Sequence, residues 1–577
     1  MRKSRVVTRK TAVRSWSRRE VLAKGAGVAS VLALPKLWIP TAWGATTPTT
    51  FDYYVSTTGS DSNPGSLAQP WAITSFETAS PNFNKMAGKR VGLIAGNYSL
   101  ANLTQPNDYS LSLVNIPGGS SSGSTYVASC DTSGNYSPRA AKLTWTGAGL
   151  VAGIIGSNGV TAPNGYVTID GLVINGGPLG GNYPDVGHIV NFYAQSYNLF
   201  SSAPANMYGI VVQNCEIYGI QQTSSGQNIG GIFIAGCVNA LIQNNYIHDI
   251  NVTSGGSAGS ANHCGATLSI GCRGTQYLYN TIANCQNSNG FWAKEGDSSA
   301  TVAYNYFYNC ATGSIAKSQQ CSAIAGFDGD SGNPNGGPDN NFVFHHNILD
   351  GNGRDIVPLN DPVYGDMNRT AYNNTVYSGS SYAGDFGCDF YCHTDSSSYG
   401  PSQTGTCLGF YNNVYVAAPN NGSGGAIYGA RLCLNPGASH GGKASQGTNG
   451  SGWVKVNNNC YYATNGSYSN FWNLPTSGAN FYSTLAAWQS AVQAIASGTE
   501  SASIAANPQF ATSIVSGNGP AQFKLASGSP CLATGQGGVN MGAWDGTTTQ
   551  IGCSFGPFST GSGSTNTIPN APTLTVS

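Results

Sequence analysis

One short pattern returns seven times along this chain and limits the possible folds more than any other feature. It reads apolar residue, two residues, Asn or Cys, one residue, apolar residue, and successive copies start 25 to 42 residues apart. A self-similar element with a period of about 20–50 residues is typical of stacked coils, propeller blades or other arrays. We expect coils with a constant core and loops of varying length. The copies are Val212–Cys215–Ile217, Ile242–Asn245–Ile247, Tyr277–Asn280–Ile282, Val302–Asn305–Phe307, Phe344–Asn347–Leu349, Ala371–Asn374–Val376 and Phe410–Asn413–Tyr415.

A second type of short run begins at glycine and precedes several copies of the pattern. The runs are Gly231–Ala235, Gly265–Ser269, Gly290–Lys294 and Gly313–Lys317. Because alternate residues of a strand face opposite sides, the second and fourth positions after Gly are expected to face outward. The first and third positions are then expected to face the core, and they are Ile232 and Ile234, Ala266 and Leu268, Phe291 and Ala293, and Ser314 and Ala316.

Two short strands per repeat, each with one inward face, can bury a core only when coils stack on one another. No regular helical pattern lies between the runs, which argues against a βαβ sheet, and a propeller would need four strands per repeat. The pattern therefore predicts an all-β fold, a right-handed parallel β-helix. The recurring Asn is expected to form a ladder at a turn, bonded to backbone and to the neighbouring coils.

Composition excludes some classes of function. Only 8% of the 577 residues are charged, against a typical share of about 25%, and the formal net charge is zero. A nucleic-acid surface needs a basic patch, so we expect no nucleic-acid partner. The 78 glycines suggest disorder, but 40% apolar and 11% aromatic residues argue for a packed core.

The N-terminus has the features of a targeting segment. Ser17–Leu22 contains a twin arginine, and an apolar run follows from about 28 to 39, so the segment resembles a bacterial Tat signal cleaved near Gly44 or Ala45. A membrane anchor is the alternative, but the run is shorter than the ~20 residues of a span and Pro35 interrupts it. We expect residues 1–45 to be a signal peptide, with the mature protein in the periplasm or outside the cell and without stable membrane insertion.

Two groups of segments carry a resemblance to a known superfamily. Asp52–Trp71 and Val91–Tyr98 resemble the opening of secreted right-handed β-helix proteins of the pectate-lyase-like superfamily. The resemblance implies one β-helix domain over 46–555, with a repeat core at about 165–465, a closing segment at about 470–555 and a flexible tail at 556–577. The superfamily includes lyases, hydrolases, epimerases and non-catalytic proteins. Segments that resemble its closing part are Ala486–Trp488, Asn507–Phe510, Phe523–Pro530 and Met541–Trp544.

The cysteines follow the same repeat. Cys285 and Cys310 each lie five residues after a ladder Asn, and Cys237 and Cys272 each lie eight residues before one. Neighbouring coils are ~4.8 Å apart, so these pairs are either disulfides or stacked, buried thiols. A second group lies in a Gly/Ser-rich loop and is expected to form disulfides: Cys388, Cys392, Cys407 and Cys433. Cys388 and Cys392 with His393 suggest zinc, but no second Cys/His pair follows at zinc-binding spacing.

Charged residues gather between Arg273 and Arg369, which marks this part of the chain as the candidate site. Lys294 and Lys317 are both four residues after the strand Gly, so on adjacent coils their ammonium groups would lie about 5 Å apart. At an effective dielectric of ~20 the repulsion is about 3 kcal/mol and lowers the pKa of a lysine toward the range of a general base. β-Elimination of a uronic acid needs such a base. The alternative is that both are solvated surface lysines.

The remaining site residues complete this hypothesis. Trp292 and Phe233 are expected to be exposed on the same sheet as surfaces on which sugar rings stack, with Glu295 and His346 as further substrate contacts. In polysaccharide lyases of this fold the base is commonly a Lys or Arg on an outward strand face, often with calcium. The resemblance thus implies Lys294 or Lys317 as base and Arg354 or calcium as the group that neutralises the substrate carboxylate.

A calcium site is one interpretation of the loop Asp328–Asn333. Asp328 and Asp330 would supply its oxygen ligands, although the third acid and terminal Glu of an EF-hand are missing, and a plain polar turn is the alternative. A competing hypothesis is glycoside hydrolysis by a pair of carboxylates. The pair would come from Asp297, Asp328, Asp330, Asp350 and Asp355.

His345 and His346 directly precede the ladder residue Asn347, so one is expected to face the core and one to face outward. The outward imidazole is either a proton-transfer group or a partner in a turn hydrogen bond. The preferred function is binding and cleavage of an acidic polysaccharide by β-elimination. The alternatives are the hydrolase and a non-catalytic protein that binds glycan at the surface.

Overall fold

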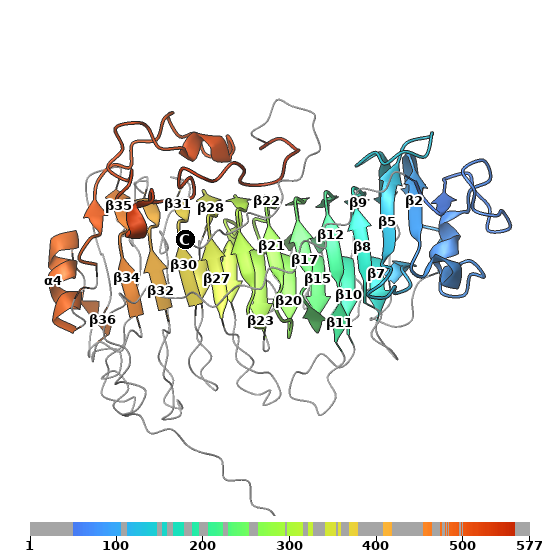
Figure 1. Ribbon diagram of the computed structural model, residues 1–577, viewed down its shortest axis with the longest axis horizontal. Helices are drawn as coiled ribbons and strands as arrows, with labels where there is room; N and C mark the ends of the chain where they lie inside the picture. Colours follow the sequence, from blue (N-terminus) through green and yellow to red (C-terminus); the bar gives the residue numbers. More distant parts are fainter. Residues whose placement is uncertain are drawn as a thin grey trace, which may run out of the picture. The chain divides into compact units, whose positions relative to one another are not determined.

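In the computed structural model, the described part of the chain is built from short parallel strands in three long sheets (Figure 1). The first 49 residues, with the expected signal peptide, and those beyond 559 lie outside the described residues. The structure describes residues 50–104, 112–146, 153–158, 165–177, 187–194, 206–222, 229–252, 264–294, 297–314, 321–326, 341–353, 356–358, 369–378, 408–417, 454–463, 474–475, 479–480, 482, 484–495, 498 and 500–559.

We name the sheets I, II and III in the order in which one coil, such as β10, β12 and β13, passes through them. Sheet I has eight strands: β4 (Ser112–Asn115), β7 (Gly153–Asn158), β10 (His188–Tyr193), β15 (Gly230–Ala235), β20 (Gly265–Ile270), β23 (Asn289–Lys294), β26 (Ile324–Gly326) and β29 (Ile356–Pro358). Sheet II has twelve: β1 (Tyr53–Val55), β2 (Arg90–Ile94), β5 (Thr125–Cys130), β8 (Val167–Asp170), β12 (Ile210–Gln213), β17 (Leu241–Gln243), β21 (Gln276–Leu278), β24 (Thr301–Ala303), β27 (Phe342–His345), β30 (Arg369–Tyr372), β32 (Leu408–Tyr411) and β34 (Val454–Asn457).

Sheet III also has twelve strands. They are β3 (Gly96–Ser99), β6 (Ala141–Thr144), β9 (Val173–Asn175), β13 (Glu216–Tyr218), β18 (Tyr246–His248), β22 (Thr281–Ala283), β25 (Tyr306–Tyr308), β28 (Ile348–Asp350), β31 (Thr375–Ser378), β33 (Val414–Ala417), β35 (Cys460–Ala463) and β38 (Ile504–Ala505). Short strands pair beside the large sheets: β11 (Met207–Tyr208) with β16 (Cys237–Val238), β14 (Gln221–Gln222) with β19 (Asn251–Val252), and, antiparallel, β36 (Leu474–Pro475) with β37 (Ala479–Asn480).

Helices are few among the described residues. The α-helix α4 spans Leu485–Ile495, and 3₁₀ turns occur at Ile73–Phe76, Phe83–Met86, Pro520–Phe523 and Gln536–Gly538. From β4 to β31 the chain passes through sheet I, sheet II and sheet III in turn, as in β10, β12 and β13 followed by β15, β17 and β18. All neighbours in the three large sheets are parallel, and crossovers between parallel strands are right-handed. The predicted right-handed parallel β-helix is confirmed.

The repeating pattern found in the sequence marks the interior of the helix. Its first apolar residue faces the core from sheet II and its last faces the core from sheet III. In sheet III, Ile217 is aligned with Ile247, and Ile247 with Ile282, and all three side chains are buried. An eighth copy, Val456–Asn459–Tyr461, extends the pattern by one coil and is absent from the seven copies found by sequence.

The expected asparagine ladder is present between sheets II and III. The Nδ2 of Asn280 donates to Asn305 Oδ1 at 3.1 Å and to the Ile242 carbonyl at 2.9 Å, while its Oδ1 accepts from Asn245 Nδ2 at 3.0 Å. The residue before each ladder Asn has a left-handed backbone, as at Asn244 with φ of 52°, a conformation that Asn tolerates well. The ladder runs through Asn245, Asn280, Asn305, Asn347, Asn374, Asn413 and Asn459.

The described cysteines are buried, and Cys237, Cys272, Cys285 and Cys310 form no disulfide. The backbone N–H of Cys237 lies 3.3 Å from the Sγ of Cys272 on the next coil. Stacked thiols, one of the two expectations for the repeat cysteines, are therefore what the structure contains. Cys388, Cys392, Cys407 and Cys433 lie outside the described residues.

The C-terminal segment, residues 500–559, lies against the outer face of sheet III. Its apolar residues Phe523 and Trp544 join one buried cluster with Tyr306 and Ile348 of sheet III, and Met541 joins another with Val414. Its backbone also meets the left-handed turn residues: Asn458 donates to Thr534, Asn373 to Asn540, and Asn244 accepts from Ser554. The segment therefore runs back along the coils, as the orange-red ribbon shows in Figure 1.

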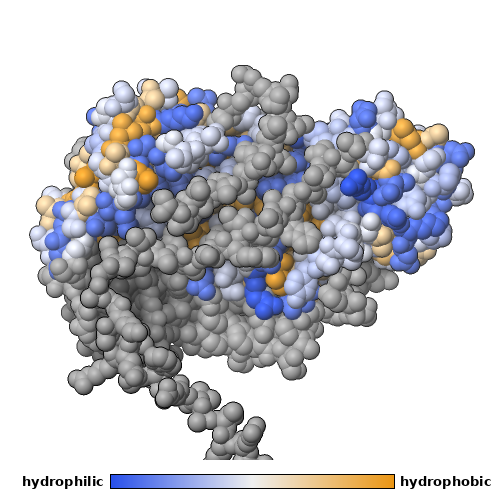
Figure 2. All heavy atoms as spheres, in the orientation of Figure 1, coloured by the Kyte–Doolittle hydropathy of each residue, from blue (hydrophilic) through white to orange (hydrophobic). Residues whose placement is uncertain are grey.

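The face drawn in Figure 2 mixes hydrophilic and weakly polar residues with small groups of apolar ones. In the described parts of the chain, the large hydrophobic side chains that are exposed are Tyr208, Val515 and Val539. None of the described helices is both long and apolar enough to cross a membrane.

Candidate functional site

The outer face of sheet I carries two of the residues selected from the sequence. Phe233 on β15 is aligned with Leu268 on β20, and Leu268 with Trp292 on β23, so the three side chains form one outward column. The prediction that Leu268 faces the core is wrong: it belongs to the outward cluster. The reason is that two successive residues, Ala266 and Thr267, turn inward at the start of β20, which shifts the alternation by one.

The expected exposure of this column is also wrong. Trp292 is only 1% exposed and Phe233 only 8% exposed. They pack into a small outward cluster with Ala235, Leu268 and the partly buried Tyr193 and Ile270. The two aromatic rings therefore contribute to packing on the outer face, and they do not form the open stacking surface that the sequence suggested.

The proposed pair of lysines does not occupy equivalent positions on adjacent coils. The strand that follows β23 in sheet I is β26, with Phe291 aligned to Ile324 and Ala293 to Gly326. The run Gly313–Lys317 is therefore not the next strand, because a longer connection intervenes before β26. The alignment of Lys294 with Lys317 is therefore wrong, and the pKa lowering derived from it loses its basis. The register partner of Lys294 on the preceding coil is Ile270.

Several other candidate residues fall outside the described residues. They are Glu295, Lys317, Arg354, Asp328 and Asp330, and of Lys294 only the backbone at the end of β23 is described. Their roles as base, carboxylate neutraliser, substrate contact and calcium ligands stay predictions. Within the part of the chain that the structure describes, no group of three or more His, Cys, Asp and Glu side chains is placed to hold a metal ion.

Sequence reasoning missed two polar residues at the start of the same face, His188 and Asn191 on β10. Ile189 and Val190 between them both point into the core, so His188 and Asn191 both face outward. The His188 ring stacks on Phe233, with ring centroids 4.3 Å apart and planes 9° from parallel. The sequence does contain a pattern that could have identified them, a polar residue on each side of an apolar pair within a strand. A search for charged residues alone does not detect this pattern.

Several side-chain polar atoms at this end of sheet I are buried and have no hydrogen-bond partner among the described residues. The atoms concerned are His188 Nδ1, both side-chain polar atoms of Asn191, and Ser112 Oγ on β4. Buried polar groups are almost always paired, and each unpaired one costs about 1–3 kcal/mol. A group of unpaired atoms on one outer face is therefore the arrangement that a bound polar ligand would satisfy.

Glycine makes room for this group. A Cβ added to Gly153 on β7 would lie 2.6 Å from the Cβ of Asn191 and 2.7 Å from the Oγ of Ser112. A Cβ on Gly230 of β15 would lie 2.8 Å from His188 Nδ1. Strand glycines often mark a place where another group approaches the backbone closely. We call Ser112, Gly153, His188 and Asn191, with the Phe233 ring, the sheet I polar site.

The sheet I polar site is electrically neutral near neutral pH. Burial lowers the pKa of His188 to about 3, so its imidazole carries no charge there. A neutral imidazole and a carboxamide each offer one or more donors and an acceptor. This set matches hydroxyl groups, which both donate and accept, better than it matches an ion.

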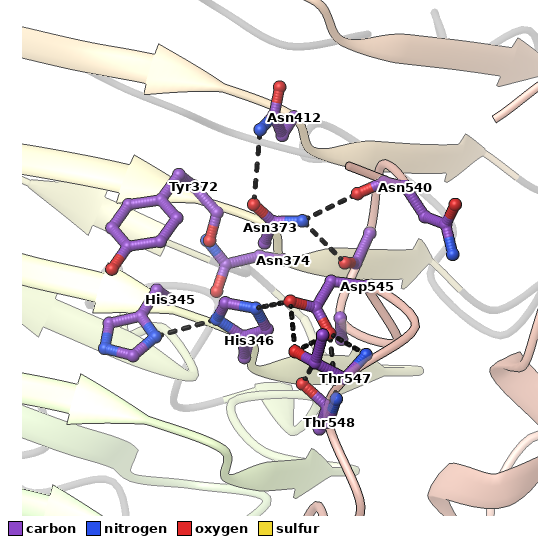
Figure 3. A network of polar contacts seen from close by, with 12 residues as sticks. His345, His346, Tyr372, Asn373, Asn374, Asn412, Asn540, Asp545, Thr547 and Thr548 are labelled. Carbon is purple, nitrogen blue, oxygen red and sulfur yellow. Dashed lines mark hydrogen bonds and ion pairs between the residues drawn. The ribbon is translucent and has the colours of Figure 1, made fainter. Parts of the chain in front are cut away.

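His345 and His346 lie at the C-terminal end of β27, where the chain turns from sheet II toward sheet III. The prediction that one of them faces the core is wrong. Phe344 fills the inward position, His345 faces outward at the end of β27, and His346 forms the left-handed turn with φ of 54°. His346 Nε2 lies 3.3 Å from Asp545 Oδ2 of the C-terminal segment, and its Nδ1 lies 2.8 Å from His345 Nδ1 (Figure 3).

The carboxylates considered for glycoside hydrolysis are engaged elsewhere where they are described. Asp350 on β28 accepts hydrogen bonds from Tyr306, Ser516 and the Gly517 N–H, and these contacts attach the C-terminal segment. Asp297 is buried and accepts from the Cys272 N–H. These two carboxylates therefore serve the fold, and Asp328, Asp330 and Asp355 lie outside the described residues.

No family model matches the chain, and no curated protein does. Among solved structures, the crystal structure of pectate lyase Pel9A aligns with 85% of this chain and 96% of its own, at 13% identity and a TM-score of 0.37. XylC in complex with xylose covers 71% and 83% at 11% identity and a TM-score of 0.33, and a rhamnogalacturonan lyase covers 66% and 87% at 12% identity and 0.31. Similarities of this size assign no reaction to the chain.

Proposed function

We propose that the chain is an exported carbohydrate-active protein that binds an acidic polysaccharide along the outer face of sheet I and cleaves it by β-elimination. The observation that carries the binding part is the sheet I polar site, where unpaired atoms of Ser112, His188 and Asn191 gather beside an aromatic ring. Hydroxyl groups of a sugar are suitable partners for all of these atoms.

The periodicity of the sheet suits a polymeric ligand. Successive strands of sheet I are ~4.8 Å apart, which is close to the length of one residue in an extended polysaccharide. A chain lying across the strands would therefore meet one coil per sugar residue. Strands β15 and β20 lie between β10, which carries the polar site, and β23, which ends at Lys294.

The cleavage part rests on the position of Lys294. It is the last residue of β23, two residues beyond Trp292 of the outward cluster. As base, its neutral amine would take the proton from C5 of a uronic acid, and the C5–H electrons would form the C4–C5 double bond. The glycosidic C4–O bond would break, and its oxygen would keep the electron pair and take a proton from water. Arg354 or calcium would neutralise the carboxylate that makes C5 acidic.

The test is the ultraviolet absorbance of the unsaturated product on pectate, alginate and glycosaminoglycans, with calcium and with a chelator. We expect the native protein to produce it on one of these, and Lys294→Gln to reduce the rate about 10²–10⁴-fold. Lys142→Gln is the matched control, because Lys142 lies on β6 of sheet III. Equal rates for the Lys294→Gln variant and the native protein would refute this base.

One observation favours a second candidate, binding without cleavage. All unpaired atoms of the sheet I polar site belong to neutral groups, which hold sugar hydroxyls but do no acid–base chemistry on them. A protein of this kind would bind the polysaccharide, produce neither unsaturated ends nor new reducing ends, and lose binding in Asn191→Leu.

A further inference from the structure

A second polar arrangement lies far from sheet I, at the edge between sheets II and III. It joins His345 at the end of β27, His346 in the following turn, and Asp545 in the C-terminal segment (Figure 3). The three side chains form a line: Asp545 Oδ2 to His346 Nε2 at 3.3 Å, then His346 Nδ1 to His345 Nδ1 at 2.8 Å. The proposed function makes no use of this line.

Asp545 is held as a carboxylate. Burial alone would raise its pKa, but the hydrogen bond and charge of His346 and the backbone N–H groups of Thr547 and Thr548 outweigh burial and hold the pKa well below its usual range. The hydroxyls of Thr547 and Thr548 donate to it as well, at 2.9 and 3.0 Å. A carboxylate with these donors is an acceptor only, so the facing Nε2 of His346 carries a proton.

The proton on His346 Nε2 decides which of the two Nδ1 atoms donates and which accepts. Two Nδ1 atoms at 2.8 Å need one proton between them. With the proton of His346 on Nε2, its Nδ1 is the acceptor and His345 Nδ1 is the donor. The Nε2 of His345 then keeps its lone pair, and Figure 3 shows the His345 ring pointing away from Asp545.

Tyrosines surround the His345 ring. Tyr372 of β30 stacks on His345, with centroids 4.9 Å apart and planes 5° from parallel, and Tyr411 of β32 stacks on Tyr372 at 5.3 Å. Tyr304 meets the His345 ring edge-on at 5.1 Å. Burial raises the pKa of Tyr411 to about 12 and that of Tyr304 and Tyr372 further, so all three hydroxyls stay protonated and can donate.

His345 itself is a neutral base, since burial and the neighbouring His346 hold its pKa well below the usual value. Unlike the buried groups of sheet I, His345, Tyr304, Tyr372 and Tyr411 keep part of their surface in solvent. Among the described residues, the hydrogen bonds and ion pairs of the two histidines involve no lysine or arginine side chain. An ionised uronate is therefore not the expected substrate, because no lysine or arginine among these contacts would neutralise its carboxylate.

We propose that this arrangement is a second catalytic site, at which His345 activates a water molecule to hydrolyse a carboxylic ester carried by a hydroxyl-rich chain. The lone pair of His345 Nε2 takes a proton from the water, and the water oxygen bonds to the ester carbonyl carbon. A tyrosine hydroxyl donates to the carbonyl oxygen as it gains charge. The intermediate then expels the alcohol, whose oxygen receives the proton from His345, and leaves the acid.

His346 and Asp545 act as positioning residues. When His345 Nε2 gains a proton, His345 passes its Nδ1 proton to His346 Nδ1, and the positive charge comes to lie beside the Asp545 carboxylate. The carboxylate thereby offsets the cost of charging a buried imidazole. The row His345, Tyr372 and Tyr411 follows three adjacent strands, so a polymer could lie along it.

The experiment measures ester hydrolysis by the full chain on p-nitrophenyl acetate, acetylated xylan and methyl-esterified pectin. We expect native activity on at least one, and a loss of about 10²–10⁴-fold in kcat for His345→Phe, which keeps the ring stack. Added imidazole should restore part of the activity to His345→Ala, which a purely structural role would not allow. Asp545→Asn should lower kcat about tenfold or more and raise the pH at which activity begins.

Two controls separate this proposal from its alternatives. Asn412→Gly removes a contact of the C-terminal segment with the Gln536 N–H and leaves the histidines untouched, so its activity should stay native. Lys142→Gln on β6 of sheet III should likewise leave ester hydrolysis unchanged. Absence of ester hydrolysis by the native protein on all three probes, or full activity of His345→Phe, would overturn the proposal.

Discussion

Buried polar groups have hydrogen-bond partners on the outer face of sheet III but lack them on the outer face of sheet I. On sheet III the C-terminal segment covers the strands, and Asp350 receives three hydrogen bonds from Tyr306, Ser516 and Gly517. On sheet I, Ser112, His188 and Asn191 are as deeply buried, yet their polar atoms have no partner. The polar groups of the first face are paired within the chain, and those of the second have no hydrogen-bond partner among the described residues.

This difference separates polar groups whose hydrogen bonds hold the fold from polar groups that make no such bond among the described residues. An unpaired buried atom destabilises the protein, so its retention points to a use outside stability. The comparison also predicts that mutations of these groups change the free energy of unfolding in opposite directions on the two faces.

The largest effect is expected for Asp350→Ala on sheet III. The substitution leaves the Tyr306 and Ser516 hydroxyls and the Gly517 N–H unpaired, and we expect a loss of about 3 kcal/mol in the free energy of unfolding. Thermal denaturation and limited proteolysis of residues 500–559 measure it. A variant with native stability and a protease-resistant C-terminal segment would show that sheet III does not depend on these bonds.

Asn191→Leu on sheet I should have the opposite sign. The apolar replacement removes two unpaired buried atoms at similar volume, so stability should rise by about 1 kcal/mol while polysaccharide binding is lost. Thermal denaturation with and without pectate or alginate measures both. A loss of stability would mean that Asn191 has partners within the protein and that the two faces do not differ.

A pH dependence is expected from the part of sheet III around His248. Burial alone would lower the pKa of His248, but hydrogen bonds to Asp249 and Glu216 raise it to about 9. Because the folded pKa lies above the unfolded value of about 6.5, this stabilisation is complete below pH 6.5 and disappears as the pH rises to 9. We expect about 1 kcal/mol, because solvent screens the half-exposed Asp249.

The melting temperature of the native protein and of His248→Gln, followed from pH 6 to pH 10, tests this dependence. The difference between the two should be largest at pH 6 and vanish near pH 10. A constant difference would assign the effect of the substitution to packing against Tyr218 and Tyr246, whose rings stack on His248.

The smallest effect is expected for Ser112→Ala at the edge of the sheet I polar site. It removes one unpaired hydroxyl oxygen, so stability should change by less than about 1 kcal/mol, in the stabilising direction. A small loss of affinity for the polysaccharide should accompany it. Unchanged affinity would confine the ligand contacts to His188 and Asn191.

The sequence predicts the coil interior well, because the inward residues repeat at fixed spacing within each copy. Asn280 and Ile282 can be assigned to the ladder and the core from the repeat alone, since both positions are needed in every coil. The register of sheet I cannot be predicted in this way, because the connection between β23 and β26 is longer than the one before it and mimics a strand at Gly313. Strict alternation also places Leu268 on the wrong face, because two consecutive residues of β20 turn inward.

The candidate sites are harder to predict than the fold. Whether Asn191 has a partner depends on strands β4, β7 and β10 together, and no local pattern records it. Asp545 lies in a segment that returns along the coils, so its pairing with His346 joins distant parts of the sequence. The distribution of charged residues guides the choice of Lys294 and Lys317, but it identifies neither Asn191 nor the pairing of Asp545 with His346.

The return path of the C-terminal segment changes how this solenoid can come apart. A stack of coils ordinarily frays from its last repeat, because each repeat touches only its neighbours. Here the segment that leaves the last coil meets Asn458, Asn373 and Asn244 in turn, so it fastens coils that do not touch one another. Peeling the final coil must also release contacts near the middle of the stack, which makes gradual fraying costly and favours loss of the whole C-terminal half in one cooperative step.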